Sequence, residues 1–467
     1  MKLVYGIHDK PKFGAVVIFA FQQLLAIMAA TIAVPAIVGN GMTASAALFG
    51  AGVGTLVYQL FTRFRSPVFL GSSFAFLGSM FAAFSGAASM EMGYLGLVLG
   101  AGFAALVYVV IAIIVKFVGV KWISKLMPAV VIGPTVAIIG LSLAGNAVGD
   151  MMKGDVLSAS GAPTASPYIA LICALVTLFT VILVSTYGHK KLRLIPFILG
   201  ILAGYAVALV FTLIGNSTGN DALKIIDLAP IKELFSGGVS FKTFVSVPSF
   251  SFLKAWKGFE TLTPEYVGTI AIGYIPVAFV VFAEHIADHK NLSTIVGQDL
   301  LKDPGLPSTL LGDGIGSFVG ALFGGCPNTT YGESIGCVAI TRNASVVSIT
   351  AAAFLALLFA FIAPFVAFLD SIPSCVMGGV CMTLYGFIAV AGLKMLQPVD
   401  LNDNRNIFVV SVILIAGVGG LVLDFTLKSG KTITLTSIAC ALILGIITNL
   451  ILAREDDGGD EPPVLMK

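Results

Sequence analysis

The sequence predicts an all-α polytopic membrane protein, and three observations support that prediction. Hydrophobic residues make up 57% of the 467 positions, and the mean hydropathy is +1.01. Charged residues make up only 11%, whereas about 25% is usual in soluble domains. Mostly apolar segments of about 20 residues recur from end to end, which is the length that a bilayer-spanning helix needs. We therefore expect a multi-pass protein of the cell membrane.

The apolar segments divide into fourteen candidate transmembrane segments. They are predicted to begin near Phe13, Thr43, Val68, Gly93, Met127, Tyr168, Leu194, Tyr266, Ser308, Asn328, Asn343, Ile372, Ile407 and Thr432.

Charge supports this count. With the N-terminus in the cytoplasm, 18 of the 26 Lys and Arg residues fall at cytoplasmic ends of the segments. Five of the other eight lie in the long segment 215–265, and long loops have little influence on orientation. An odd number of segments would break this alternation, so we expect both termini in the cytoplasm.

The long segment divides the chain into two sets of seven. We expect residues 1–214 to form the first repeat, 215–265 an extracytoplasmic loop, 266–453 the second repeat and 454–467 a cytoplasmic tail. Seven is odd, so the two repeats must enter the membrane in opposite orientations, which is the inverted-repeat plan of many secondary transporters.

A short sequence match supports the repeat. Residues 128–133 read PAVVIG and residues 373–378 read PSCVMG. Both fit the pattern P-x-x-V-x-G, and each opens the fifth segment of its half. A match of six residues also arises by chance, so the equal number of segments in the two halves is needed to support the repeat.

The third segment of each half is poorly suited to a continuous helix. One contains SPVFLGSSFAFLGSM from Ser66, and the other, the tenth overall, contains GGCPNTTYGESIG from Gly324. Pro and Gly disfavour a helix interior. Non-helical backbone at membrane depth survives only inside protein or beside a wet cavity. We therefore predict short extended breaks in the third and tenth segments and a binding site between them. The alternative is a pair of kinked helices packed through small residues.

Ionisable residues in apolar sequence are the next candidates. Glu284 and Asp288 lie in one apolar run, roughly 40° apart on one helical face at about 100° per residue. Charges at this depth are costly and are expected to face a bundle interior or cavity. His285 and His289 have the spacing of a zinc-binding pair, but the HExxH pattern is missing. We interpret His289 and Lys290 as cations at a helix C-terminus and expect no metal site.

The expected chemistry of the site suggests a planar polar ligand. Glu333 lies where the tenth segment should resume its helix, so the positive end of the helix dipole favours its ionised form. Inward carboxylates accept hydrogen bonds, whereas freed backbone N–H groups around Phe74 and Gly332 donate them. Uracil and related bases carry matching N–H donors and C=O acceptors. Aromatic neighbours that could stack on such a ring are Phe74, Phe76, Tyr331 and Tyr385.

Composition argues against other partners. The net charge of +2 comes with basic residues in short clusters rather than a stripe, so no nucleic-acid partner is expected. The six cysteines lie in or beside apolar segments without a CxxC pair. We interpret them as small core residues rather than as disulfides or metal ligands.

The motif PNTTYGESIGCVAITR at 327–342 resembles the signature region of the nucleobase/ascorbate transporter family, and most closely its bacterial uracil permease branch. GSSFAF at 71–76, AEH at 283–285, DLLKDPGL at 299–306 and the GGV and LYG motifs within 378–386 resemble that branch in the same order. The resemblance covers nearly the whole chain.

The resemblance implies a core domain that moves against a gate domain, uptake of a base by proton symport without a cofactor, and a homodimer. It implies that Glu284 and Glu333 hold the N–H groups of the base and that the amides of Phe74 and Gly332 hold its oxygens. The remaining pocket residues would be Tyr331, Ala30 and Tyr385. Purine-selective relatives tend to carry Gln where Glu333 stands, so a pyrimidine is expected.

Two positions depart from the family pattern. The signature Asn after the glutamate is Ser334, which is too short to make the same bridging amide contacts. The histidine that typically follows the membrane glutamate by four residues is Asp288, with His289 one position later. We assign proton coupling to Asp288, Glu284 and His289, and a sodium-coupled variant remains an alternative.

Other functions remain open from the sequence. A channel could share the transmembrane segments without needing two buried acids. An anion transporter of the same fold class would place cations at the site, and a purine carrier would share the whole plan. An intramembrane enzyme would have only His285 and His289 as its catalytic pair, so we expect a transporter.

Overall fold

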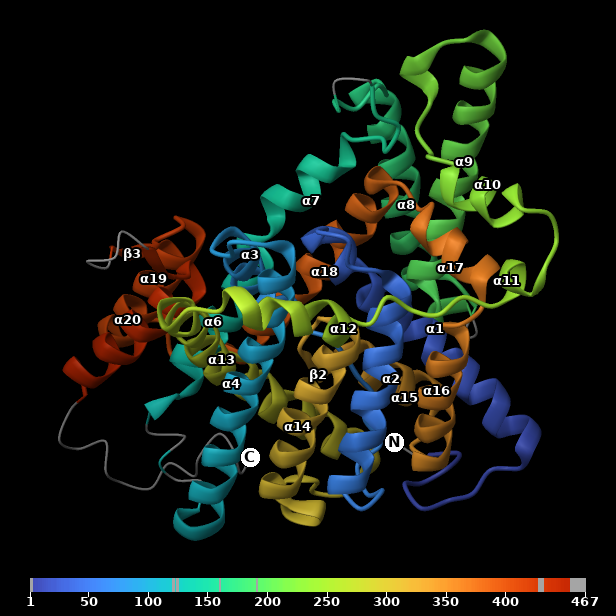
Figure 1. Cartoon of the computed structure of the whole chain (residues 1–467). Coiled ribbons are helices and arrows are strands. Elements are labelled where there is room, and N and C mark those ends of the chain that lie inside the picture. The colour runs from blue at the N-terminus through green and yellow to red at the C-terminus, as the bar shows by residue number, and fades with distance from the viewer. Residues whose placement is uncertain are drawn as a thin grey trace.

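The computed structural model describes residues 3–119, 122, 126–158, 161–189, 192–426 and 432–453. Most of these residues are helical (Figure 1). The predicted tail 454–467, and the basic residues Lys2, Lys121, Lys125, Lys190 and Lys191 used in the charge argument, lie outside this description.

The first half of the chain contains long apolar helices and one extended interruption. In order, its main elements are α1 (Phe13–Val38), α2 (Ala44–Phe61), β1 (Leu70–Ser72), the 3-10 turn η1 (Phe74–Phe76), α3 (Leu77–Ser85), α4 (Met90–Val118), α6 (Ala129–Ser142), α7 (Ala144–Met151), α8 (Pro167–Tyr187) and α9 (Pro196–Thr218).

The second half repeats this plan. Its main elements are α13 (Pro264–Val296), η5 (Leu301–Gly305), α14 (Leu306–Gly324), β2 (Asn328–Thr330), α15 (Gly332–Thr341), α16 (Val346–Phe359), α17 (Ala363–Asp370), α18 (Ser374–Met395), α19 (Asn404–Val418), β3 (Leu423–Thr426), β4 (Thr432–Leu435) and α20 (Ser437–Ile451).

Among the described residues, nine helices are long and apolar enough to cross a membrane, and four further apolar helices are shorter. The prediction of a helical membrane protein is confirmed, whereas the exact number of fourteen spans stays a prediction. One predicted start is wrong. Thr432 begins β4, which pairs with β3, and the helix follows only at Ser437.

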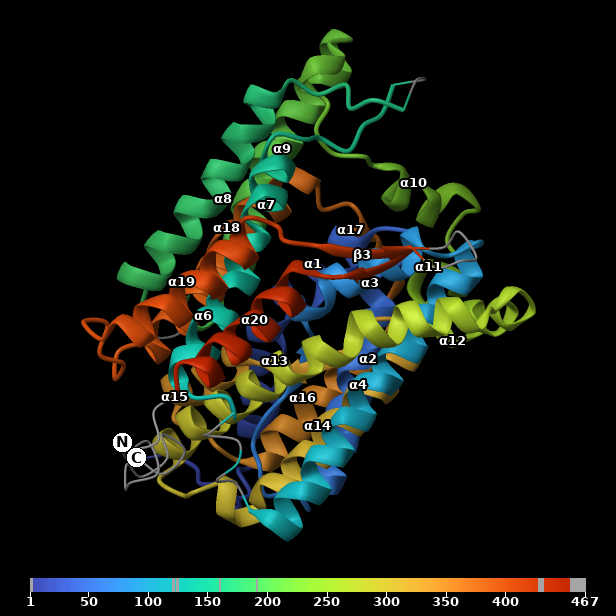
Figure 2. The ribbon, with the colours of Figure 1, turned by 90° about the vertical axis from the view of Figure 1, so that its left-hand side faces the viewer.

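The helices form two groups. The first, here called the core group, consists of α1 to α4 and α13 to α16 together with β1 and β2. The second, called the gate group, consists of α6 to α9 and α18 to α20. In Figure 2 the gate helices α8, α18 and α19 lie toward the upper left, and α4, α14 and α16 lie toward the lower right.

Glycines allow the closest helix crossing of the core group. A Cβ atom at Gly50 would meet the carbonyl oxygen of Gly320, and one at Gly54 would meet that of Gly316. Each helix therefore presents two glycines four residues apart, a spacing that lets helix backbones approach closely in membranes. This crossing holds α2 against α14.

The gate group preserves the symmetry of the repeats. Pro128 and Pro373 are the residues before α6 and α18, two helices that pack against each other. Pro373 occupies the position in the second repeat that Pro128 occupies in the first. At the same separation along the chain, Gly378 corresponds to Gly133 and Gly392 corresponds to Ala147. Gly133 approaches the backbone of Gly392, and Gly378 approaches the backbone of Ala147. The same contact thus occurs twice with the repeats exchanged, which fits the predicted inverted repeat.

The segment between α9 and α13 contains short helices rather than plain coil. They are α10 (Ala229–Ser236), α11 (Phe241–Phe244), α12 (Ser251–Ala255) and the 3-10 helix η4 (Trp256–Thr261). α12 and η4 pack against α4, and α10 and α11 pack against α17. Figure 2 places these elements on the side of the molecule opposite the two termini.

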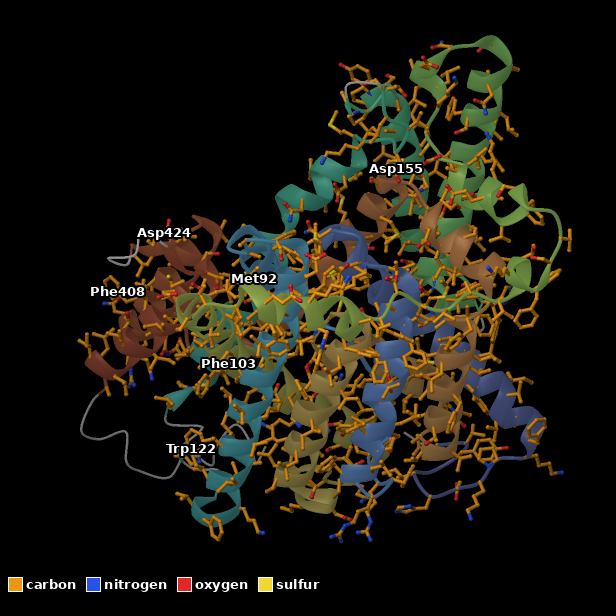
Figure 3. All side chains as sticks on the ribbon, viewed as in Figure 1. Met92, Phe103, Trp122, Asp155, Phe408 and Asp424 are labelled. Carbon is orange, nitrogen blue, oxygen red and sulfur yellow. The ribbon has the colours of Figure 1, made fainter. Side chains whose placement is uncertain are left out.

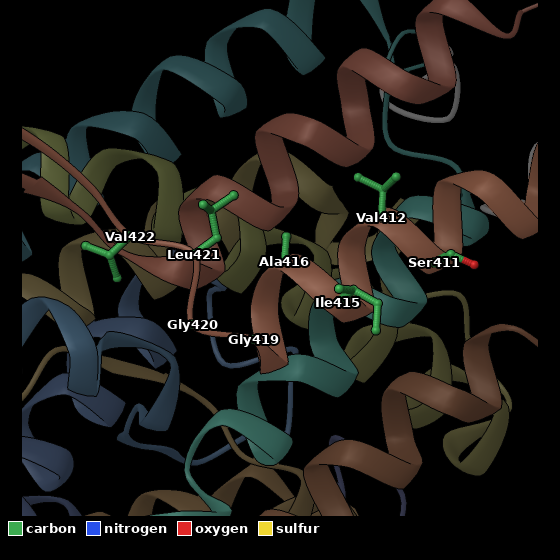
Figure 4. A pocket seen from close by; sticks show the side chains of 8 residues that line it. All are labelled: Ser411, Val412, Ile415, Ala416, Gly419, Gly420, Leu421 and Val422. Carbon is green, nitrogen blue, oxygen red and sulfur yellow. The ribbon is translucent and has the colours of Figure 1, made fainter.

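Many large apolar side chains are exposed, as a bilayer requires, and Phe408 is one of them (Figure 3). Phe408 on α19 is 59% exposed. A hollow of about 810 Å³ also lies on this helix, lined by eight residues between Ser411 and Val422 (Figure 4). Its lining contains none of the predicted site residues, which lie elsewhere in the molecule.

Candidate substrate site

The two predicted breaks meet each other inside the core group. β1 pairs antiparallel with β2, with Leu70 opposite Thr330, Gly71 opposite Thr329 and Ser72 opposite Asn328. All six residues are buried. The extended breaks in the third and tenth segments are therefore confirmed. Their pairing satisfies the backbone groups that would otherwise be costly at this depth.

Gly71 and Tyr331 lock this crossing. A Cβ atom at Gly71 would collide with the ring of Tyr331, so only glycine allows the ring to lie across β1. The Tyr331 hydroxyl donates a hydrogen bond of 2.8 Å to the carbonyl oxygen of Ser72. The amide of Ser73 donates to the carbonyl oxygen of Pro327 at 2.9 Å. Tyr331 is thereby held rigidly at the start of α15.

Ser334 makes a bridge that the sequence did not predict. Its hydroxyl oxygen accepts one hydrogen bond from the Gln23 side chain on α1 and another, of 3.1 Å, from the amide of Phe69. The expectation that a serine would be too short for bridging contacts at this position is wrong, because α1 and the approach to β1 both come close to it. Ser334 joins three segments of the core group.

Helices begin directly after both breaks. η1 starts at Phe74, and α15 starts at Gly332 with Glu333 in its first turn. The first N–H groups of a helix have no partner within the helix and carry partial positive charge. Gly332 is exposed, and a Cβ atom built on it would meet nothing within 4 Å among the described residues. The start of α15 therefore faces open space.

Aromatic side chains connect this region to the gate group. The rings of Phe74 and Tyr385 meet edge to face, with centroids 5.6 Å apart. Tyr385 belongs to α18, whereas Phe74 belongs to the core group. The sequence-predicted residues Phe74, Tyr331 and Tyr385 are all buried. The candidate site thus lies at the boundary between the two helix groups.

Two carboxylates reach the site from α13, which packs against β2 and α15. Asp288 accepts a hydrogen bond of 2.6 Å from the Thr330 hydroxyl at the end of β2. Glu284 lies one turn earlier on the same helix. Within the described part of the chain, neither Glu284 nor Glu333 accepts a side-chain hydrogen bond. Both carboxylates remain available to a ligand.

His289 has a different environment from the predicted one. α13 continues to Val296, so His289 and Lys290 do not lie at a helix C-terminus and that interpretation is wrong. His289 is fully buried. Its Nδ1 donates to the carbonyl oxygen of His285 at 2.8 Å, so Nε2 is the atom that faces the Tyr58 hydroxyl, at 2.7 Å.

His285 has hydrogen-bond partners at both of its ring nitrogens. Its Nδ1 lies 2.7 Å from Asp313 Oδ2 and its Nε2 lies 3.0 Å from the Thr309 hydroxyl. Both partners belong to α14. No group of three potential metal ligands occurs in the ranges that the structure describes. His285 therefore joins α13 to α14.

Ala30 is the remaining predicted site residue. It is buried on α1, which packs against β1 and α15. The structure thus places it in the core group beside the crossing, without a contact that assigns it a role.

The sequence did not predict three further candidate residues: Asp313, Thr330 and Gln23. Asp313 could have been found, because it is a carboxylate inside the apolar run LLGDGIGSFVG and the rule that selected Glu284 applies to it equally. Thr330 and Gln23 carry no such signal, since their importance depends on partners that are distant in sequence.

The fold is that of transporters built from a core and a gate. The chain superimposes on the transmembrane domain of the cyanobacterial bicarbonate transporter BicA with a TM-score of 0.61 and 14% identity, covering 95% of this chain and 100% of that one. SLC26A9 gives a TM-score of 0.57 and 12% identity, with coverages of 94% and 66%. At these identities the likeness establishes the fold alone.

The sequence places the chain more narrowly. Residues 14–425 match a family model described as the permease family, and the chain belongs to this family of nucleobase and ascorbate transporters. It is 38% identical to the uracil permease of Bacillus caldolyticus, over 97% of this chain and 95% of the relative. The uracil permease of Escherichia coli strain K12 is 33% identical, with 95% of each chain covered. The chain is therefore a multi-pass membrane protein of the permease family.

Proposed function

We propose that this permease imports uracil, or a close pyrimidine base, by proton symport. The observation that carries the proposal is the pairing of β1 with β2, which brings two helix starts together with Glu333 and sets them beside the carboxylates of α13. The names of the relatives support uracil in particular.

The arrangement suits the hydrogen-bonding edges of uracil. Its ring N–H groups need acceptors, and the carboxylates of Glu284 and Glu333 have none of their capacity used by side chains among the described residues. Its carbonyl oxygens need donors, which the free amides at Phe74 and Gly332 supply. The edges of Phe74 and Tyr385 form one apolar wall of the pocket.

The division into two helix groups supports alternating access as the mechanism. The site residues lie mostly on the core group, and only Tyr385 comes from the gate group. We infer that the core group carries the base past the gate group and that the contact between Phe74 and Tyr385 is remade in each cycle. Relative movement of two rigid bundles around a fixed site is a common mode of secondary transport.

Proton coupling is assigned to the carboxylates of α13. Glu284 and Asp288 are one turn apart, and two like charges at that separation disfavour joint ionisation. We propose that the pair shares one proton that enters from outside, frees Glu284 to receive the base and leaves past His289. The hydrogen bond from Thr330 to Asp288 supports this role because it ties the pair to the end of β2. Sodium in place of the proton is the alternative.

A competition experiment tests the substrate. Purified protein is incubated with labelled uracil, and unlabelled uracil, thymine, xanthine, urate or ascorbate is added. Uracil is expected to compete far better than xanthine. Tighter binding of xanthine would refute the pyrimidine assignment. The coupling is tested separately with the protein in sealed vesicles, where accumulation of labelled uracil against its gradient without a proton gradient would refute proton symport.

A further inference from the structure

A second polar cluster lies inside the core group, on α14, α4 and α13. It surrounds a cavity of about 10 Å³ whose lining includes Tyr108, Asp313, Ser317 and Asn328. None of these residues belongs to the proposed uracil site. Asp313 and Ser317 are four residues apart on α14, so both side chains lie on the same face of that helix.

Three polar atoms at this cavity have no protein partner. They are the Tyr108 hydroxyl, Asp313 Oδ1 and Ser317 Oγ, each of which is buried without a hydrogen bond in the described structure. Asp313 is only 1% exposed, Tyr108 3% and Ser317 5%. Buried polar atoms are rarely left unpaired, and an unpaired carboxylate oxygen is especially costly.

We propose that this cavity holds one ordered water molecule. A water needs about 10 to 15 Å³ and two to four polar partners. The cavity has room for one water, and three unpaired polar atoms lie at it. The water donates to Asp313 Oδ1 and accepts from the Tyr108 and Ser317 hydroxyls. Every one of the three atoms is then satisfied.

The hydrogen bonds of His285 argue for water over a cation. The Thr309 hydroxyl donates to the carbonyl oxygen of Leu306 at 3.1 Å, so His285 Nε2 is the donor toward Thr309. One further proton lies between His285 Nδ1 and Asp313 Oδ2. Whichever of the two atoms holds this proton, the two side chains together carry no net charge. A cation at Oδ1 would have no countercharge, and three oxygens are fewer than a hard cation usually takes.

The water completes a hydrogen-bonded chain across three helices. It runs from Thr309 through His285 and Asp313 to the water and on to Tyr108, and so connects α14, α13 and α4. On α13, His285 lies between the two carboxylates of the proposed site, directly after Glu284 and three residues before Asp288. Asp313, Tyr108 and Ser317 are therefore positioning residues that fix the rotation of α13 without touching the base.

A density map of the purified, full-length protein at high resolution is the direct test. One peak is expected within about 2.7 to 3.2 Å of all three oxygens, and it should persist when sodium is replaced by choline in the buffer. An empty cavity would refute the proposal. A peak that disappears without sodium would identify a cation site instead. This test does not depend on the substrate being uracil.

Two substitutions at Ser317 give a functional test, which rests on the proposed function. Ser317→Ala keeps the space for the water and removes one partner, whereas Ser317→Val fills the space and leaves Asp313 Oδ1 unpaired. The valine variant is expected to lower the maximal uptake rate by about tenfold or more, since a misplaced, unpaired group costs at least about one hydrogen bond. Its Kd for uracil should change much less, and the alanine variant, which keeps the water, should lose less of the maximal uptake rate than the valine variant.

Ser348→Val is the matched control, because Ser348 is also a buried serine without a partner but lies on α16, away from the cavity. Equal loss of uptake in Ser317→Val and Ser348→Val would show a general packing effect and refute the positioning role.

If Ser317→Val does not fold, Tyr108→Phe replaces it. Loss of the density peak, or a lower maximal uptake rate at unchanged Kd, supports the water. Unchanged density and unchanged uptake contradict the role of Tyr108 as its partner. Absence of uracil uptake by the wild-type protein would refute the proposed function and leave the density test intact.

Discussion

Glu333 combines a partly buried position in the proposed site with a fixed backbone. Its helix start is held by Tyr331 on one side and by Ser334 on the other, so the carboxylate cannot drift away from the crossing. A neutral amide is cheaper to bury than a carboxylate. The residue is therefore well suited to a substitution that changes charge without changing shape.

Replacing Glu333 with Gln is expected to weaken uracil binding by roughly ten- to a hundredfold, because a hydrogen bond to a charged group contributes about 1.5 to 3 kcal/mol. The yield of folded protein should barely change. Equilibrium binding of labelled uracil measures the effect, with Glu260→Gln at an exposed position as the control. Normal binding by the Glu333 variant would mean that the pocket is misplaced.

Asp288 is held by a single side-chain hydrogen bond, from Thr330. Asp288→Asn keeps an acceptor for that bond but removes the titratable group. Uracil binding should stay measurable, while the pH dependence of uptake and accumulation against a gradient should weaken. Uptake by vesicles over a pH series measures this, with Asp299→Asn as the control. An unchanged pH profile would move the coupling to Glu284 or His289, and a dependence on external sodium at fixed pH would indicate sodium coupling.

The paired strands are the smallest element on which the site depends. Gly71→Ala would push the Tyr331 ring off β1 and break its hydrogen bond to Ser72, and such overpacking typically costs about 1 to 3 kcal/mol. We expect a lower melting temperature and weaker uracil binding together. Gly145→Ala is the control, because a Cβ atom there meets nothing within 4 Å. If the two variants behave alike, the ring does not lock the crossing.

The start of α18 is capped from outside its own repeat. Asp155, in the connection between α7 and α8, accepts hydrogen bonds from the amide of Ser374 at 3.1 Å and from its hydroxyl at 2.6 Å (Figure 3). Asp155→Ala should lower stability by about 0.5 to 2 kcal/mol, as loss of a helix cap does. Thermal unfolding of this variant, of Ser374→Ala and of the double variant measures the effect. Additive losses in the double variant would show that the pair is not coupled.

Local composition was enough to predict the two breaks, because Pro67, Gly71 and Pro327 disfavour helix wherever they occur. It was not enough to predict their register, because pairing between segments so distant in sequence leaves no periodic trace. For the same reason, the sequence did not predict the hydrogen bond from Thr330 to Asp288 or the bridge at Ser334. The environment of His289 was predicted wrongly because α13 extends beyond the apolar part of its sequence, to Val296.

At the scale of the whole molecule, the proposed site draws residues from both halves of the chain. Phe74 comes from the first half and Gly332, Glu333 and Tyr385 come from the second, so neither half contains the complete proposed pocket. Dividing the chain after Gly238, an exposed residue of the connecting segment, should give two fragments that bind uracil only when they are expressed together. Binding by either fragment alone would contradict a site at the crossing of β1 and β2.

The distance along the chain between β1 and β2 has a consequence for biosynthesis. The Tyr331 hydroxyl and the Ser72 carbonyl that it meets are 259 residues apart. The ribosome must therefore make all the elements between the two strands before β1 can pair. These are α3, α4, the gate helices α6 to α9, the connecting segment, α13 and α14. Until then β1 leaves backbone groups unpaired inside the membrane, where each unpaired group is costly. A nascent chain that stops before β2 should consequently be retained by membrane chaperones or degraded, and release should coincide with emergence of the strand at Asn328–Thr330.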